Sequence, residues 1–191
     1  MSVDSLANCA DARLRARGFS RDRLTWNRST GSTVDVVDIQ VNKTGTRVTL
    51  NCGVLDTDTY AVCWGTPAPA FVEEPFCTVR ARLGRLMGRG DQWWSPHDDD
   101  AIDELLERIE DTVLPFIARM NDRREMANYL AEQIKQKRYP DPLAVAYLAI
   151  VEAQLGDVNR ACSVLAEHRP NVLGDWQIRL KEVSSRLGCP D

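Results

Sequence analysis

The sequence predicts an α+β fold in which an antiparallel sheet of about four strands packs on helices, followed by an all-α C-terminal extension. Residues 33–41 have the composition of a strand, and residues 77–82 alternate between apolar and polar side chains, as half-buried strands do. From residue 101 onward, apolar residues recur at helical spacing instead. We expect the α+β domain over residues 1–121 and the extension, made of two helical hairpins, over residues 122–191.

The first predicted elements are an amphipathic helix and a short strand. Within residues 5–17, Leu6, Ala10 and Leu14 lie at helical spacing, and Gly18 is a good residue to end the helix. The run LTWNRS at residues 24–29 then predicts a strand, and the Gly31 turn separates it from the next one.

Two runs that flank the sequence NKTG predict a hairpin. If residues 33–41 pair with residues 46–54 so that Ile39 faces Val48 and Val37 faces Leu50, the apolar side chains share one face. The same register places Gln40 opposite Arg47 on the other face, together with Asn51. A sheet with one wet face has this pattern.

Residues 57–75 predict a long loop or excursion, in which YAVCW could form a short strand. The run FCTVRARL predicts the fourth strand. Its polar side chains, Arg80 and Arg82, are then expected on the same face as Gln40 and Asn51.

The remaining chain predicts helices. One apolar stripe runs from Ile102 to Met120, with a kink or break at Pro115. A helix over residues 121–139, a hairpin that turns at Gly156 and a last helix follow. The hairpin resembles a single tetratricopeptide-like unit, although such repeats are stable only when several stack.

Charge and composition limit the function classes. The net charge of −4 and the pI near 5.3 argue against a dedicated nucleic-acid binder, which is usually basic. The N-terminal residues show no secretory signal, so we expect a cytoplasmic protein without a membrane partner. The six cysteines form no CxxC pair, and in a reducing compartment we expect free thiols, several of them buried.

The order of these segments resembles a known family. A helix that ends in Gly18-Phe19, the strands DVVDIQVNKTGTRVTLNCGV and CTVRARLGRL, and a Trp pair before an acidic helix resemble the bacterial family catalogued as domain of unknown function 4304. The resemblance covers roughly the first two thirds of the chain and implies an α+β domain without an assigned activity. Because related small α+β proteins often accompany toxins as immunity partners, it also implies a protein-binding role by association.

The candidate binding residues lie on the predicted polar face and next to it. Arginine suits carboxylates or phosphates, and Gln and Asn add orientable donors and acceptors. Consecutive residues of an extended segment face opposite ways, so we expect one of two adjacent tryptophans in the core and the other at the surface. The candidates are Gln40, Arg47, Asn51, Arg80, Arg82, Trp93 and Trp94. A solvated face, or one that the chain itself covers, is the simpler alternative.

Catalysis and metal binding have little support in the sequence. No nucleophile, phosphate-loop or metalloprotease motif occurs, and the two histidines, His97 and His168, are isolated from cysteine clusters. Asp98, which precedes two further aspartates, indicates a helix cap more than a metal site. We therefore expect no catalytic residue, cofactor or metal.

These observations favour a non-catalytic protein-binding protein, and the immunity-type neutralisation of a cognate bacterial toxin is its specific form. The alternative is a small-anion or nucleotide-binding module, or an enzyme, that uses the arginine-lined sheet face. The sequence leaves the oligomeric state open.

Overall fold

The structure is a computed structural model that describes residues 2–190 and divides into two compact units. Unit 1 combines the residues up to Leu55 with Ala70–Arg119, and unit 2 combines Asp56–Pro69 with the residues from Met120 onward. The α+β class is confirmed, because unit 1 contains the sheet and unit 2 is helical.

The sheet of unit 1 is an antiparallel meander of five strands. Its order follows the chain: β1 (Ser20–Asp22), β2 (Thr25–Thr30), β3 (Thr33–Val41), β4 (Val48–Asp56) and β5 (Val79–Arg82). The sequence predicted about four strands; the additional one, β1, has three residues, too few to show a periodic pattern.

The register of the β3–β4 hairpin differs from the prediction by two residues. Asn42 N donates to Arg47 O at 2.9 Å, so these two residues face each other across the hairpin. The side chain of Asn42 also accepts from the backbone N–H groups of Thr46 and Arg47, which fixes a longer turn than NKTG alone. Because side chains alternate with a period of two, a two-residue shift leaves each side chain on its predicted face.

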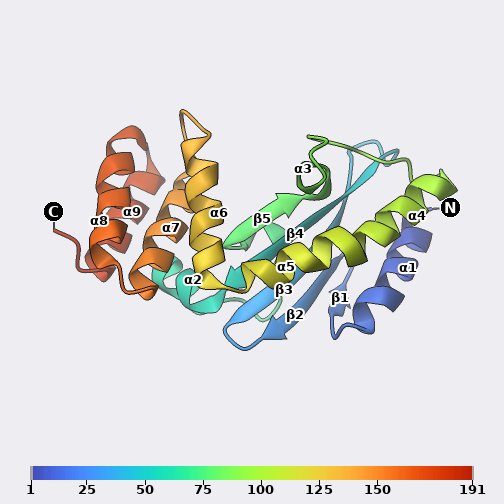
Figure 1. Cartoon of the computed structure of the whole chain (residues 1–191), viewed down its shortest axis with the longest axis horizontal. Helices are drawn as coiled ribbons and strands as arrows, with labels where there is room; N and C mark the ends of the chain where they lie inside the picture. The colour runs from blue at the N-terminus through green and yellow to red at the C-terminus, as the bar shows by residue number, and fades with distance from the viewer. Residues whose placement is uncertain (1, 191) are drawn as a thin grey trace. The chain divides into compact units, whose positions relative to one another are not determined.

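Helices cover the apolar face of this sheet (Figure 1). They are α1 (Val3–Arg15), α4 (Asp99–Arg108) and α5 (Leu114–Met120). Trp26, which is fully buried on β2, donates from Nε1 to Asp11 Oδ1 of α1 at 2.9 Å. Asp98 caps α4 through hydrogen bonds from two backbone N–H groups, as the sequence predicted.

The predicted irregularity at Pro115 takes the form of a π-helical turn, η2 (Ile109–Val113), between α4 and α5. Leu114 N donates to Ile109 O, five residues back. Proline has no N–H with which to continue the regular ladder, and a widened turn immediately before it accommodates this loss.

The other face of the sheet is partly covered by the chain itself. The segment after Ala70 crosses it: the Asn27 side chain donates to Val72 O at 2.9 Å and accepts from Val72 N at 2.6 Å. The short 3₁₀ helix η1 (Glu74–Phe76) and buried Cys77 follow. The prediction of a largely wet face therefore holds only for the part near Gln40 and Arg82.

The chain leaves the sheet after β5 and then returns to the same edge. The short helix α3 (Leu83–Leu86) and the residues up to Trp93 form a protruding loop, called the bulge below. After it, Trp94 exchanges two backbone hydrogen bonds of 2.9 Å with Val48. Gly84 permits the bulge to fold tightly, because a Cβ atom there would lie 2.5 Å from Gly90 O.

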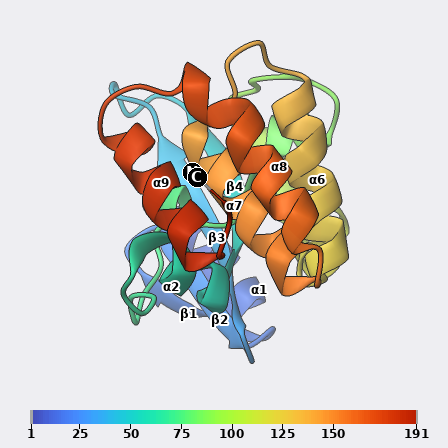
Figure 2. The ribbon, with the colours of Figure 1, turned by 90° about the vertical axis from the view of Figure 1, so that its left-hand side faces the viewer.

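Unit 2 consists of helices, and Figure 2 shows α7 and α8 as adjacent helices of a hairpin. The predicted turn at Gly156 is confirmed, with φ of 90° at that glycine. The helices are α2 (Thr57–Trp64), α6 (Arg123–Lys135), α7 (Pro142–Gln154), α8 (Val158–His168) and α9 (Asp175–Arg186), with a 3₁₀ turn η3 (Arg169–Asn171).

Helix α2 replaces the loop or strand that was predicted for residues 57–64. The Asp56 carboxylate caps it by accepting from Thr59 N at 2.8 Å. Trp64 Nε1 donates to the Tyr147 hydroxyl of α7 at 3.2 Å, and the Trp64 ring meets that of Trp176 in α9 at a centroid distance of 5.9 Å. An element between two strands of unit 1 thus belongs to the core of unit 2.

The prediction that all cysteines are free thiols is wrong for one pair. Cys162 of α8 and Cys189 after α9 form a disulfide, whereas Cys9, Cys52, Cys63 and Cys77 are free. Over residues 2–190, none of the helices combines the length and the apolar character that crossing a bilayer requires.

Candidate functional site

Three neighbouring strands bring polar side chains together on the open part of the sheet. Asn51 of β4 pairs with Arg82 of β5 in the strand register. The Asn51 amide donates to Gln40 Oε1 of β3 at 3.1 Å, and Arg82 donates to Asn51 Oδ1 at 3.3 Å and to Gln40 Oε1 at 2.8 Å. The three side chains therefore form a closed hydrogen-bonded triangle.

Two residues of the returning bulge complete this arrangement. Arg82 forms an ion pair with Asp91, and its guanidinium lies 5.1 Å from the centre of the Trp93 ring. The hydrogen bond from Arg82 is the main cause that lowers the pKa of Asp91. We call Gln40, Asn51, Arg82, Asp91 and Trp93 the Arg82 cluster.

The Arg82 side chain is fixed from several directions but is still 25% exposed. Trp93 is half-buried and Gln40 is exposed. A guanidinium that is stacked on an aromatic ring and held by hydrogen bonds has few rotamers left to lose when it binds a partner. The cluster thus presents a preorganised arginine and tryptophan at the surface of a sheet.

Two further carboxylates lie beside the cluster. Asp38 accepts from Thr25 Oγ1 at 2.9 Å and from Asn51 Nδ2 at 3.2 Å, yet burial raises its pKa. Glu74 is 3.4 Å from Arg80 Nη1, and burial raises its pKa as well. Because Arg80 pairs with Glu74 and Arg82 pairs with Asp91, a phosphate would compete with a carboxylate at either arginine.

Trp94 has a structural role, in contrast to Trp93. It is 4% exposed and donates from Nε1 to Glu104 Oε2 of α4 at 2.7 Å, a bond that is the main cause lowering the pKa of Glu104. The expectation that the two tryptophans face opposite ways therefore agrees with their placement.

The predicted candidates do not all meet in one place. Gln40, Asn51 and Arg82 are hydrogen-bonded to one another, and Trp93 stacks on Arg82. Arg80 lies on the same strand as Arg82 but pairs with Glu74. Arg47 is exposed near the β3–β4 turn and Trp94 is in the core, so neither joins the cluster.

Sequence reasoning missed two acidic participants, Asp91 and Glu74. Asp91 lies two residues before Trp93, and this spacing puts both side chains on one side of an extended segment, which was an available signal. Glu74 gave no such signal, because its position depends on the path of the segment after Ala70 across the sheet.

The buried thiols of both units are poor nucleophiles. Burial raises the pKa of both Cys52 and Cys77, and it raises that of Cys63 to about 12, so all three are protonated at neutral pH. Within residues 2–190, no three His, Cys, Asp or Glu side chains group closely enough to hold a metal ion.

Two glycines of the segments that resemble the family stand where the structure disfavours a larger residue. A Cβ on Gly53 would lie 2.6 Å from Val79 O and 2.7 Å from Cys77 Cβ, so the crossing segment could not approach β4. Gly18, with φ of 85°, ends α1 in the left-handed conformation that glycine adopts at helix ends.

Comparison with known proteins gives one match. The family described as "Domain of unknown function (DUF4304)" matches residues 10–119, which include the whole sheet and the Arg82 cluster. Neither a curated protein nor a solved structure matches the chain. Because the match extends over more than half of the 191 residues, the chain belongs to the DUF4304 family.

Proposed function

We propose that the protein is a non-catalytic, cytoplasmic protein-binding protein, and that the Arg82 cluster is its contact surface. The observation that carries the proposal is the stack of Arg82 on Trp93, in which Arg82 is held by side chains from two neighbouring strands and by Asp91 of the bulge. Arginine and tryptophan are enriched among the residues that contribute most binding energy at protein interfaces.

The charge balance of this surface supports a protein partner over a polyanion. Both Arg80 and Arg82 already pair with carboxylates, so the face offers hydrogen bonds and an aromatic surface without a strong positive field. A partner can dock against the fixed Trp93 ring and hydrogen-bond to the exposed Gln40 amide. In the specific form of the proposal, the partner is a bacterial toxin and the protein neutralises it by occluding its active surface.

The test starts with the full-length protein. A tagged copy is used to purify a stoichiometric partner from the source cells, and the product of the neighbouring gene is assayed for toxicity with and without the protein. The dissociation constant of the purified partner is then measured for wild type, Trp93→Ala and the control Arg15→Gln, whose side chain lies on α1.

Trp93→Ala should weaken binding by about 30-fold or more, which corresponds to a hot-spot contribution of about 2 kcal/mol. Arg15→Gln should bind as wild type does. If no stoichiometric partner is found, or if folded Trp93→Ala binds the partner as tightly as wild type, the Arg82 cluster is not the contact surface. A binding partner without toxicity would retain the binding role and reject the immunity role.

A further inference from the structure

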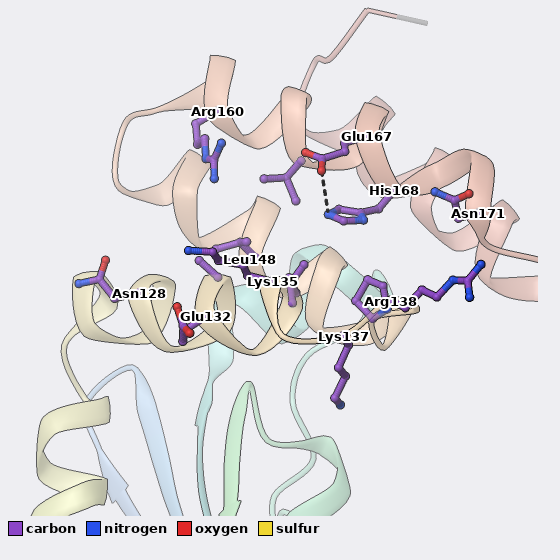
Figure 3. A pocket seen from close by; sticks show the side chains of 14 residues that line it. Asn128, Glu132, Lys135, Lys137, Arg138, Leu148, Arg160, Glu167, His168 and Asn171 are labelled. Atoms are coloured by element: carbon purple, nitrogen blue, oxygen red, sulfur yellow. Dashed lines mark ion pairs between the residues drawn. The ribbon is translucent and has the colours of Figure 1, made fainter.

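Unit 2 contains a hollow between α6 and α8, which Figure 3 shows from close by. Its volume is about 660 Å³, within the range of ligand-binding clefts. His168 reaches in from α8, Glu132 lies on α6, and Lys137 and Arg138 lie on the connection at one end of the hollow (Figure 3). The half-buried Ala131 of α6 and Pro140 before α7 contribute apolar surface.

The hollow concentrates positive charge in a chain of net charge −4. Four exposed cations line it, and none of them lies within ion-pairing distance of a carboxylate in the described part of the chain: Lys135, Lys137, Arg138 and Arg160. The two glutamates of the lining interact locally, since Glu132 accepts from Gln136 at 3.0 Å and Glu167 lies 3.9 Å from His168.

This arrangement contrasts with Arg80 and Arg82 of the sheet, which pair with carboxylates of the chain itself. Unpaired cations around a concave surface attract anionic groups and favour them over cationic ones. The charge of the lining therefore favours an acidic ligand.

The exposure of the cations decides between a small anion and a longer acidic segment. All four cations are exposed, and a contact between exposed charges changes affinity by only about two- to fivefold. A single phosphate group is too small to contact all four cations at once. A peptide segment with several carboxylates can contact all of them and also pack apolar side chains against the hollow.

We propose that the hollow between α6 and α8 binds an acidic, partly apolar peptide segment of a partner protein. The hollow and the Arg82 cluster lie in different units, so the result of testing one site does not determine the result for the other.

The experiment measures the fluorescence anisotropy of a short labelled peptide of glutamate and leucine residues as the full-length protein is added. A peptide with lysine in place of glutamate is the ligand control. Lys135→Glu/Arg160→Glu is the test variant, and Lys181→Glu is the matched control, because Lys181 is an exposed lysine of unit 2 outside the hollow. Circular dichroism verifies that each variant is folded.

The acidic peptide should bind wild type and Lys181→Glu equally and the double variant about tenfold or more weakly, and binding should weaken with added salt. Failure of the acidic peptide to bind, or an equal loss in Lys181→Glu, would overturn the proposal. Tighter binding of tripolyphosphate, or of a single-stranded oligonucleotide, would overturn it in favour of that ligand class.

Discussion

Gly84→Ala is the most informative single substitution, because two physical effects predict opposite signs for it. Gly84 is the second residue of α3, and alanine is normally more stable than glycine in a helix by about 0.5–1 kcal/mol. Its φ is not positive, so the backbone itself accepts alanine. Propensity alone therefore predicts a small gain in the free energy of unfolding.

Packing predicts a loss instead. The new Cβ would lie 2.5 Å from Gly90 O and 2.8 Å from Gln92 N, both backbone atoms that cannot rotate away. The bulge would have to move away by about 0.9 Å for the distance to Gly90 O to reach ordinary van der Waals contact. Overpacking of this kind costs about 1–3 kcal/mol, so after the helical gain we expect a net loss of about 1–2 kcal/mol.

Urea denaturation monitored by tryptophan fluorescence measures this difference. Gly88→Ala is the control, because its Cβ meets no atom within 4 Å although its φ is 71°. That variant reports left-handed backbone strain of about 1 kcal/mol without a clash. A Gly84→Ala protein as stable as wild type, or clearly more stable than Gly88→Ala, would refute the steric explanation of the bulge.

Two other predictions concern titration and the disulfide. Burial raises the pKa of Glu74, so its contribution to stability is fully present below the ordinary glutamate pKa and is lost as the pH rises through the raised value. Glu74→Gln should be more stable than wild type at pH 7, and the difference should shrink on acidification; a difference that grows on acidification would contradict this. Alkylation of the denatured protein should label four thiols before reduction and six after it, and six before reduction would exclude the Cys162–Cys189 bond. Reduction should lower the free energy of unfolding by about 3.5 kcal/mol on a chain-entropy basis, for a sequence separation of 27 residues.

The sequence contained most of the information on the strands and helices. Alternation in residues 37–41 and 79–82 depends only on which side chains face the core, so the polar face could be predicted although the hairpin register was wrong by two residues. The register depends on the turn, where the Asn42 side chain binds two backbone N–H groups that periodicity does not reveal.

Neither helix α2 nor the disulfide could be predicted from side-chain periodicity, and the reason differs between them. The run YAVCW has strand-forming side chains, and contacts such as Trp64 with Tyr147, from a distant part of the chain, determine that it is helical. Cys162 and Cys189 are far apart in sequence, and their pairing follows from the packing of α8 and α9. In the Arg82 cluster, Gln40, Asn51 and Arg82 were predicted from their strands, and Trp93 was a predicted candidate as well. Asp91, on the same connecting segment as Trp93, was missed.

The place of α2 in the chain has a consequence for biosynthesis. The helix leaves the ribosome between two strands of unit 1, whereas the first residues of its partner α7 are made about 80 residues later. At typical elongation rates this delay is on the order of 4–16 s. During that time Cys63, which is fully buried in the finished protein, also lacks Arg186 of α9, which donates to its carbonyl oxygen. Translation speed over the segment before α7 should therefore affect how much of the protein reaches its native state.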